Sequence, residues 1–329
     1  RLLTLRKYNR LEVSERGKIT RDAENWDFWS TTYDFADSQG VELSTTRPRR
    51  YLQFQMDFSS DITAGSRLDY LEWTASPPAA TALVGEIDPW QVETAQVTQF
   101  TYSIRPTIGL DDPGFDRLEI SVNGGRLLSV DAVRIGGEDV EFTPVEEANE
   151  RLVVAVPKVD ISRTEEVVEV DFNGEIFRFG ATFNGHVSNS ETPQDIQQPV
   201  QAGDATALRD GNTLSVQSLL LGDEVLSALD LGTGVFTPND DGVNDGLDIT
   251  YDLLKLVEPA QVVVEMRDLT GGIVRQVYDD LGVAGRHKRR WDGRDDSGHK
   301  VGPGIYICRV EIETEKGRQQ RSGVVVVAY

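Results

Sequence analysis

"EEVVEVDFNGEIFRFGATF", residues 165–183, decides the fold class. Apolar and polar side chains alternate on both sides of Asn173-Gly174, which is the pattern of half-buried β-strands. Asn-Gly between two such stretches is the strongest short-range signal for a β-hairpin, because both turn positions need a positive φ. We therefore predict a hairpin here. Its second strand would place four apolar residues on one face: Phe177, Phe179, Ala181 and Phe183.

The same period of two recurs along the chain. It appears in residues 50–58, where Leu52, Phe54, Met56 and Phe58 share a face. It appears again in residues 99–105, where Phe100, Tyr102 and Ile104 share a face. Strands at intervals of about ten residues, separated by Gly, Asp, Asn and Pro, indicate β-sandwiches. Helical signals are short and confined to residues 22–35 and 222–231. The sequence predicts an all-β protein made of tandem β-sandwiches.

At 329 residues the chain is long for one domain. We expect a jelly-roll-like sandwich in residues 1–108, a second sandwich in 109–229, and a last domain in 230–329. The first joint is rich in Pro, Gly and Asp. A polar stretch, residues 186–212, is too long for a structureless loop in a compact domain, so we expect it to pack along a neighbour.

The net charge is −22, and the middle of the chain carries most of it, with a net of −16 over residues 109–230. Such a charge repels phosphate backbones and argues against nucleic-acid binding. It serves solubility or forms an acidic docking face for a basic partner. No run of 18 apolar residues occurs, so the sequence predicts no transmembrane segment.

Cys308 is the single cysteine, so the sequence offers no disulfide framework. We expect a packed thiol on a strand face. A bacterial protein of the periplasm, the cell surface or the exterior, stabilised by its cores, has this composition. The sequence begins at Arg1 without a methionine, which is consistent with a removed signal or anchor.

The loop in "VFTPNDDGVNDGLDITYDL", residues 235–253, is compared with the calcium-loop pattern. Setting Asp241-Gly242 at the fifth and sixth positions places Asn239, Asp245 and Asp248 at ligand positions. The first position falls on Thr237, which has no carboxylate. Weak calcium binding is one interpretation. The other is a turn that needs no ion, in which side chains of Asn239, Asp241, Asn244 and Asp245 accept backbone N–H groups.

Three segments together carry a family resemblance: "FTPNDDGVND", then "MRDLTGGIVRQV", then "WDGRDDSGHKVGPGIYICRV". Residues 235–329 resemble the Ig-like domain of the flagellar hook-capping protein FlgD and the similar carboxy-terminal modules of secreted proteins, including type IX secretion substrates. Asp240 departs from the Gly that is common in those relatives. The resemblance implies an Ig-like sandwich in which the Asp/Asn-rich loop is a fold signature, and we expect Trp291 to be buried.

The front of the chain, through "NWDFWSTTYDF", "RPRRYLQFQMDF" and "LVGEIDPWQV", resembles a galactose-binding-like jelly roll. That resemblance implies carbohydrate binding, in which aromatic rings stack on the sugar and arginines donate hydrogen bonds. The alternative is that the aromatics fill a core. The residues of this hypothesis are Trp26, Trp29, Trp90, Arg49 and Arg50.

One basic cluster, "RHKRRW", stands out in the acidic chain. Its charges either contact an acidic partner or anionic lipid headgroups, or they protect an exposed strand edge from aggregation, and the second interpretation is favoured. The residues are Arg286, Lys288, Arg289 and Arg290.

No catalytic motif or cofactor signature is present, and the three histidines lie far apart. We therefore predict a non-enzymatic protein of the bacterial envelope, needing no cofactor apart from the weak calcium considered above. It would act as a scaffold or accessory subunit for other envelope proteins, including subunits of a membrane complex. The alternative is a carbohydrate-binding or adhesive surface protein that uses its first domain.

Overall fold

The computed structural model describes residues 5–17, 26, 28–33, 41, 43, 51–56, 67–73, 77–192, 197–209, 211–219, 223–315 and 317–329. The chain divides into two units, Arg1–Thr45 and Thr46–Tyr329, each described by itself. The first contains α1 (Leu5–Tyr8) and η1 (Val13–Glu15). Of the helix predicted at 22–35, the described residues Trp26 and 28–33 are not helical.

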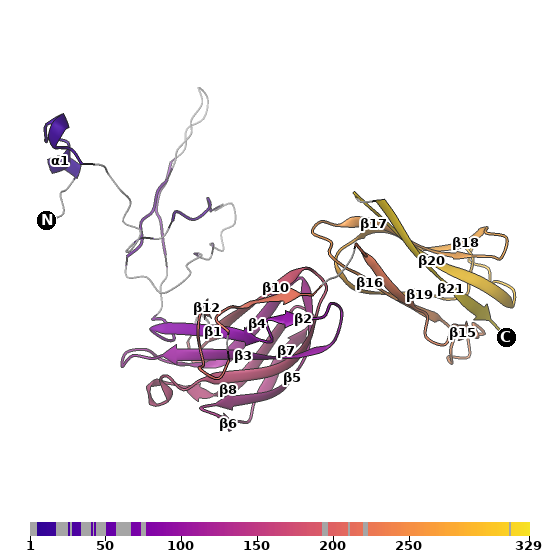
Figure 1. Ribbon diagram of the computed structural model, residues 1–329, viewed down its shortest axis with the longest axis horizontal. Helices are drawn as coiled ribbons and strands as arrows, with labels where there is room; N and C mark the ends of the chain where they lie inside the picture. The colour runs from indigo at the N-terminus through magenta and orange to yellow at the C-terminus, as the bar shows by residue number, and fades with distance from the viewer. Residues whose placement is uncertain are drawn as a thin grey trace. The chain divides into compact units, whose positions relative to one another are not determined.

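A first β-sandwich is formed by the strands between Ala82 and Ser218 (Figure 1). Among the described residues, one sheet has the order β12-β1-β3-β9-β5-β6, and the other has the order β2-β13-β10-β4-β8-β7, with β11 beside β10. The strands are β1 (Ala82–Asp88), β2 (Gln91–Val92), β3 (Thr98–Thr107), β4 (Phe115–Asn123), β5 (Gly125–Ile135), β6 (Glu138–Asp139), β7 (Thr143–Ala148), β8 (Arg151–Val159), β9 (Val168–Ile176), β10 (Gly180–Ser188), β11 (Gln198–Pro199), β12 (Gln201–Ala202) and β13 (Ser215–Ser218).

Aromatic rings join the two sheets of this sandwich. Phe100 on β3 and Phe172 on β9 lie 5.1 Å and 5.7 Å from the ring of Phe183 on β10, centroid to centroid. All three are buried, and the period-two prediction for β3 is confirmed, since Phe100, Tyr102 and Ile104 are all core residues. Alternation therefore leaves the other face of β3 for polar side chains.

The hairpin predicted at residues 165–183 is wrong. β9 runs straight through Asn173-Gly174, which pair with Gln99 and Thr98 of β3. A Cβ on Gly174 would lie 3.3 Å from the Phe100 ring, so glycine serves close packing here and not a turn. The chain turns after Ile176 and continues as β10 in the opposite sheet. Phe179, in that crossing, is 56% exposed and does not share the buried face.

The boundary predicted at residue 108 is also wrong. β1 and β3 precede it, yet they pair with each other and with β9 in one sheet. Their side chains belong to the same hydrophobic core as those of β4 to β13. Before Ala82 the described residues contain no strand, and residues 51–56, expected to be one, have no regular structure. The jelly roll expected for residues 1–108 is therefore not seen in the described part of that range.

The polar stretch 186–212 packs along the first sandwich, as expected. Its described residues include β11, which pairs with β10, and β12, which runs parallel to β1. Val200 and Ala205 are buried. This segment therefore forms part of both sheet edges.

A second β-sandwich follows (Figure 1). Among the described residues its sheets have the orders β14-β16-β19 and β15-β21-β20-β17-β18. The strands are β14 (Leu226–Asp230), β15 (Val235–Phe236), β16 (Leu247–Leu253), β17 (Ala260–Arg267), β18 (Ile273–Gly282), β19 (Gly285–Trp291), β20 (Gly304–Thr314) and β21 (Gly317–Val327).

The core of this second sandwich begins at Val225, before the predicted start at residue 230, and residues 226–230 form a strand where a helix was expected. Trp291 is buried, as predicted, with its ring 5.2 Å from that of Phe236 and 5.6 Å from that of Tyr306. Cys308 is a packed thiol whose pKa burial raises to about 12. The all-β prediction is confirmed across the described strands.

Candidate interaction surface

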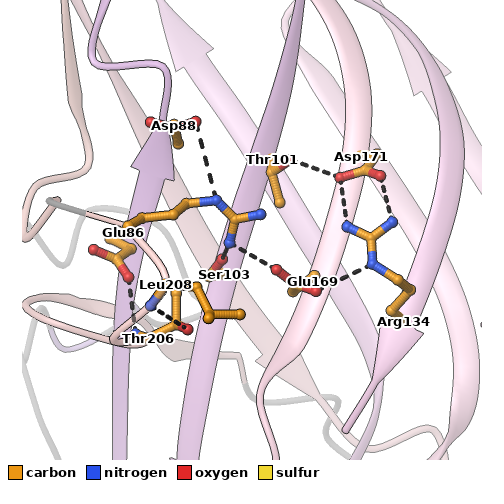
Figure 2. Close-up of polar contacts among 10 residues, drawn as sticks. Glu86, Asp88, Thr101, Ser103, Arg134, Glu169, Asp171, Thr206 and Leu208 are labelled. Carbon is orange, nitrogen blue, oxygen red and sulfur yellow. Dashed lines mark hydrogen bonds and ion pairs between the residues drawn. The ribbon is translucent and has the colours of Figure 1, made fainter. Parts of the chain in front are cut away.

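The outward face of the six-stranded sheet carries a network of charged side chains (Figure 2). Arg134 on β5 donates to both oxygens of Asp171 on β9, at 2.6 Å and 3.0 Å, and to Glu169 at 3.1 Å. Burial alone would raise the pKa of Asp171, but hydrogen bonds from Arg134 and Thr101 outweigh it and the pKa is lowered. The pair is therefore ionised, bidentate and largely removed from water.

Arg209 ties a loop to the same face. Its guanidinium donates to Glu169 at 2.7 Å and to the Ser103 hydroxyl at 2.9 Å, and it lies 4.0 Å from Asp88. Burial would raise the pKa of Glu169, yet hydrogen bonds from Arg209 and Arg134 lower it. The loop that follows β12 is thus held across β1, β3 and β9.

Glu86 on β1 lies beneath that loop and is fully buried. One carboxyl oxygen accepts from the backbone N–H of Thr206 at 2.8 Å, while the other has no hydrogen-bond partner. Burial raises the pKa of Glu86, against the lowering effect of the Thr206 N–H. In this network Arg134 and Arg209 pair with Asp171 and Glu169, and Arg209 fastens the loop, which is a structural role.

A small cavity lies on the outward face of the other sheet. It has a volume of about 110 Å³ and its lining includes Glu119, Arg151 and His186. Small-molecule sites usually occupy about 300–1,000 Å³. Arg151 already bridges Glu119 and Glu146, at 2.8 Å and 2.7 Å. The cavity therefore has room for a few waters and no developed site for a substrate.

In the Asp/Asn-rich loop the side chains bind the loop's own backbone. Asn239 accepts from the N–H of Asp241 at 3.0 Å, and Asp241 accepts from the N–H of Val243 at 2.8 Å. Asp245 accepts from two N–H groups, those of Asp240 at 2.7 Å and Gly242 at 2.6 Å. The bonds to Asn239 and Asp241 form Asx turns, and Asp245 closes the loop from its far end, so the loop is ordered without an ion.

Two residues of the loop depart from the expected roles. Asn244 was expected to accept, but its side-chain amide donates to the Val235 carbonyl at 3.1 Å. Asp248 lies outside the turn and pairs with Lys288 at 2.8 Å. Within the described ranges, no group of three or more His, Cys, Asp or Glu side chains is placed to hold a metal ion. Weak calcium binding by Asn239, Asp241, Asp245 and Asp248 stays a prediction.

The basic cluster lies on β19, an edge strand of the three-stranded sheet. Lys288 and Arg290 are exposed, while Arg289 turns inward and places its guanidinium 3.9 Å from the Tyr278 ring centroid. Alternation thus divides the cluster between two faces.

Arg286 is the most constrained member of that cluster. It binds both oxygens of Asp252, at 2.8 Å and 3.0 Å, and Glu175 at the end of β9, at 2.7 Å. Glu175 is 1% exposed, so this ion pair is shielded from water on one side. Arg286 therefore binds carboxylates of this chain. That Arg286 also contacts a partner protein stays a prediction.

The residues proposed for carbohydrate binding are described only in part. Trp26 and Trp29 are 42% and 57% exposed, and both belong to the unit Arg1–Thr45. Trp90 is 42% exposed and follows β1 in the other unit. Arg49 and Arg50 lie outside the described residues. A shared sugar platform therefore stays a prediction.

An acidic edge, residues 138–150, distinguishes the first sandwich from the surfaces above. It contains six acidic residues and no basic one: Glu138, Asp139, Glu141, Glu146, Glu147 and Glu150. β6 and β7, which it includes, are the edge strands of the two sheets. Except for Glu146, which pairs with Arg151, these side chains form no ion pair with any described residue. All except Glu146 are exposed.

The acidic edge borders a shallow notch with a mixed polar and apolar lining, formed by residues 140–143 and 155–157. Thr143 is the first residue of β7 and pairs with Ala155 of β8. Residues 140–142 connect β6, in the other sheet, to β7. Val140, Phe142 and Pro157 are apolar members of its lining, and Glu141 and Thr143 are polar ones. A shallow surface with acidic flanks is electrostatically complementary to a basic partner.

No protein-family model and no curated protein match the chain. Among solved structures, it is similar to dimeric latent PorU from Porphyromonas gingivalis, with a TM-score of 0.26, 10% identity, and coverage of 75% of this chain and 34% of that one. For PorZ, a surface component of the type-IX secretion system of that bacterium, the TM-score is 0.23 and the identity 18%, with coverage of 44% of this chain and 15% of that one. For a variant of BcpA, the major pilin subunit of Bacillus cereus, the TM-score is 0.27 and the identity 12%, with coverage of 75% of this chain and 66% of that one.

The chain thus spans about a third of PorU and about a seventh of PorZ. TM-scores this low assign neither a family nor a function to it.

Proposed function

We propose that the chain is a non-enzymatic interaction protein of the bacterial periplasm or cell surface, a scaffold or accessory subunit that binds other proteins in a larger, membrane-associated assembly. The observation that carries the proposal is the acidic edge, together with the shallow notch in which Val140 and Phe142 are only partly buried. Other charge clusters, such as the network around Arg134, are neutralised internally. The edge is instead left exposed, and protein-binding surfaces combine such an apolar centre with a charged rim.

Further support comes from the framework. Two β-sandwiches present edges and loops from rigid sheets, and the resemblance of residues 235–329 to FlgD-like Ig-like modules agrees with a role in an extracytoplasmic assembly. No helix among the described residues is long and apolar enough to cross a bilayer.

Affinity purification of the full chain from its native organism tests the proposal. The acidic edge is altered by Glu138→Gln, Glu141→Gln and Glu150→Gln. A matched control removes three exposed acids elsewhere, by Asp111→Asn, Glu258→Gln and Glu315→Gln. We expect stoichiometric partners that the edge variant loses and the control retains, with weaker recovery at higher salt. Equal recovery by both variants, or none with the unaltered chain, would refute the proposal.

A further inference from the structure

We propose that the notch binds the amino-terminal segment, residues 1–21, of a second copy of this chain, so that copies associate head to tail. This inference rests on the proposed function and names the partner of its surface. It starts from charge. Residues 1–21 contain seven basic and two acidic side chains, in a chain whose net charge is −22.

The segment and the acidic edge complement each other. The segment has a net charge of +5, and the edge has six acidic residues and no basic ones. Arg6 and Arg10 are exposed in the segment, as Glu138 and Glu141 are at the edge. Long-range attraction of this kind orients partners and speeds their encounter.

The apolar residues of the segment and of the notch also complement each other. The segment carries leucines at positions 2, 3, 5 and 11 among its basic residues, and Val13 is 79% exposed. The notch offers Val140 and Phe142, which are only partly buried against the core. Burial of such side chains supplies affinity, and the charges around them supply orientation.

The edge strand β7 sets the mode of binding. It contains Pro144, and its register with β8 shifts between Pro144 and Glu146. A proline and a bulge on an edge strand disfavour the addition of another strand. The segment therefore docks through side chains in the notch, and its contacts with β7 are electrostatic.

Because the segment and the notch are different surfaces, the contact is heterologous. Each copy keeps one free notch and one free segment, so association continues into chains unless the geometry closes a ring. Sedimentation velocity on the full chain should show a size distribution that grows with concentration and shrinks with added salt. A synthetic peptide of residues 1–21 should cap the notch and shorten the distribution.

Charge exchange provides the decisive test. One variant carries Glu138→Lys and Glu141→Lys, and the other carries Arg6→Glu and Arg10→Glu. All four positions are exposed, so both variants should fold, which circular dichroism checks. Each variant alone should associate at least about tenfold more weakly than the unaltered chain. Mixed in equal amounts they should associate again, because each supplies the charge that the other lacks.

A mixture that stays monomeric would overturn the inference, as would an unaltered chain that is monomeric at every concentration. If that monomer still captured other proteins through Glu138, Glu141 and Glu150, the proposed function would stand and only the identity of the occupant would be wrong. If it captured none, both would fail. If the chain did not self-associate but the peptide still displaced its own residues 1–21 from the notch, the segment would dock within one copy. That result would also contradict the inference.

Discussion

Replacing Trp291 tests how the second sandwich is held together. Its side chain is 1% exposed, and its ring packs edge-on against Phe236 and Tyr306. Its indole N–H donates to the Arg294 carbonyl at 2.9 Å. Trp291→Ala removes both the packing and the hydrogen bond, whereas Trp291→Phe keeps most of the packing. The two variants together separate the contributions.

The size of the effect follows from the burial. A buried tryptophan removes roughly 150–250 Å² from water. At about 25 cal/mol per Å² this corresponds to about 4–6 kcal/mol. The Cβ that alanine keeps, and relaxation around the cavity, reduce the expected loss for Trp291→Ala to about 3–5 kcal/mol. Trp291→Phe loses the hydrogen bond and some volume, so about 1–2 kcal/mol is expected.

Urea unfolding gives the free energies. Trp26, Trp29, Trp73 and Trp90 are 42–57% exposed, so the change in fluorescence on unfolding comes mainly from Trp291. The alanine variant lacks that reporter and is followed by circular dichroism. Val257→Ala, at a side chain of the second sandwich that is 79% exposed, is the control and should change stability by less than about 0.5 kcal/mol. A loss below about 1 kcal/mol for Trp291→Ala would refute the packing described here.

Three more perturbations follow from the structure. Chelation with EDTA should leave the melting temperature unchanged while Asp241→Ala lowers it, because backbone N–H groups order the loop; a calcium-dependent rise at micromolar ion would contradict this. Burial raises the pKa of Glu86, so the folded state favours the protonated carboxyl group. The stability that this group contributes is fully present below the ordinary pKa of 4.5 and is lost as the pH rises through the folded-state pKa. Glu86→Gln should therefore stabilise the chain in urea at neutral pH and not in acid, by about 1.4 kcal/mol per pKa unit; equal effects at both would contradict it. Gly185→Ala should cost about 1–3 kcal/mol, because the new Cβ meets the buried Tyr102 hydroxyl, and adding Tyr102→Phe should recover part of the loss in the same assay.

Local patterns predicted the parts of this protein that depend on neighbours in sequence. The alternation in β3 placed Phe100, Tyr102 and Ile104 in the core, as the structure has them. The Asp and Asn spacing near residue 240 predicted Asx turns, and Asn239 and Asp241 accept backbone N–H groups as expected. Both features arise within a few residues, where backbone geometry and side-chain reach decide the result.

The candidate surface could be predicted only in part. The acidic middle of the chain was evident from composition, but β6 and β7 become neighbouring sheet edges only because β5 and β8 occupy different sheets. The notch depends on the path of residues 140–143 between those sheets. Arg286 looked available in the sequence, yet Asp252 and Glu175 bind it. Neither carboxylate is near it in sequence, so no local pattern pairs them.

The sequence by itself determined that the chain is mostly β-strand, and in strands such as β3 it determined which face is apolar. Tertiary structure alone decided which strands pair and where a sheet ends. Asn173-Gly174 illustrates the difference: its residues favour a turn locally, but β3 pairs along both of them and Phe100 fills the space beside Gly174. A period-two pattern indicates which side of its strand a residue faces, but it does not indicate to which sheet the strand belongs. That choice is made by contacts between residues far apart in the chain, whose combined burial outweighs the preference of a dipeptide.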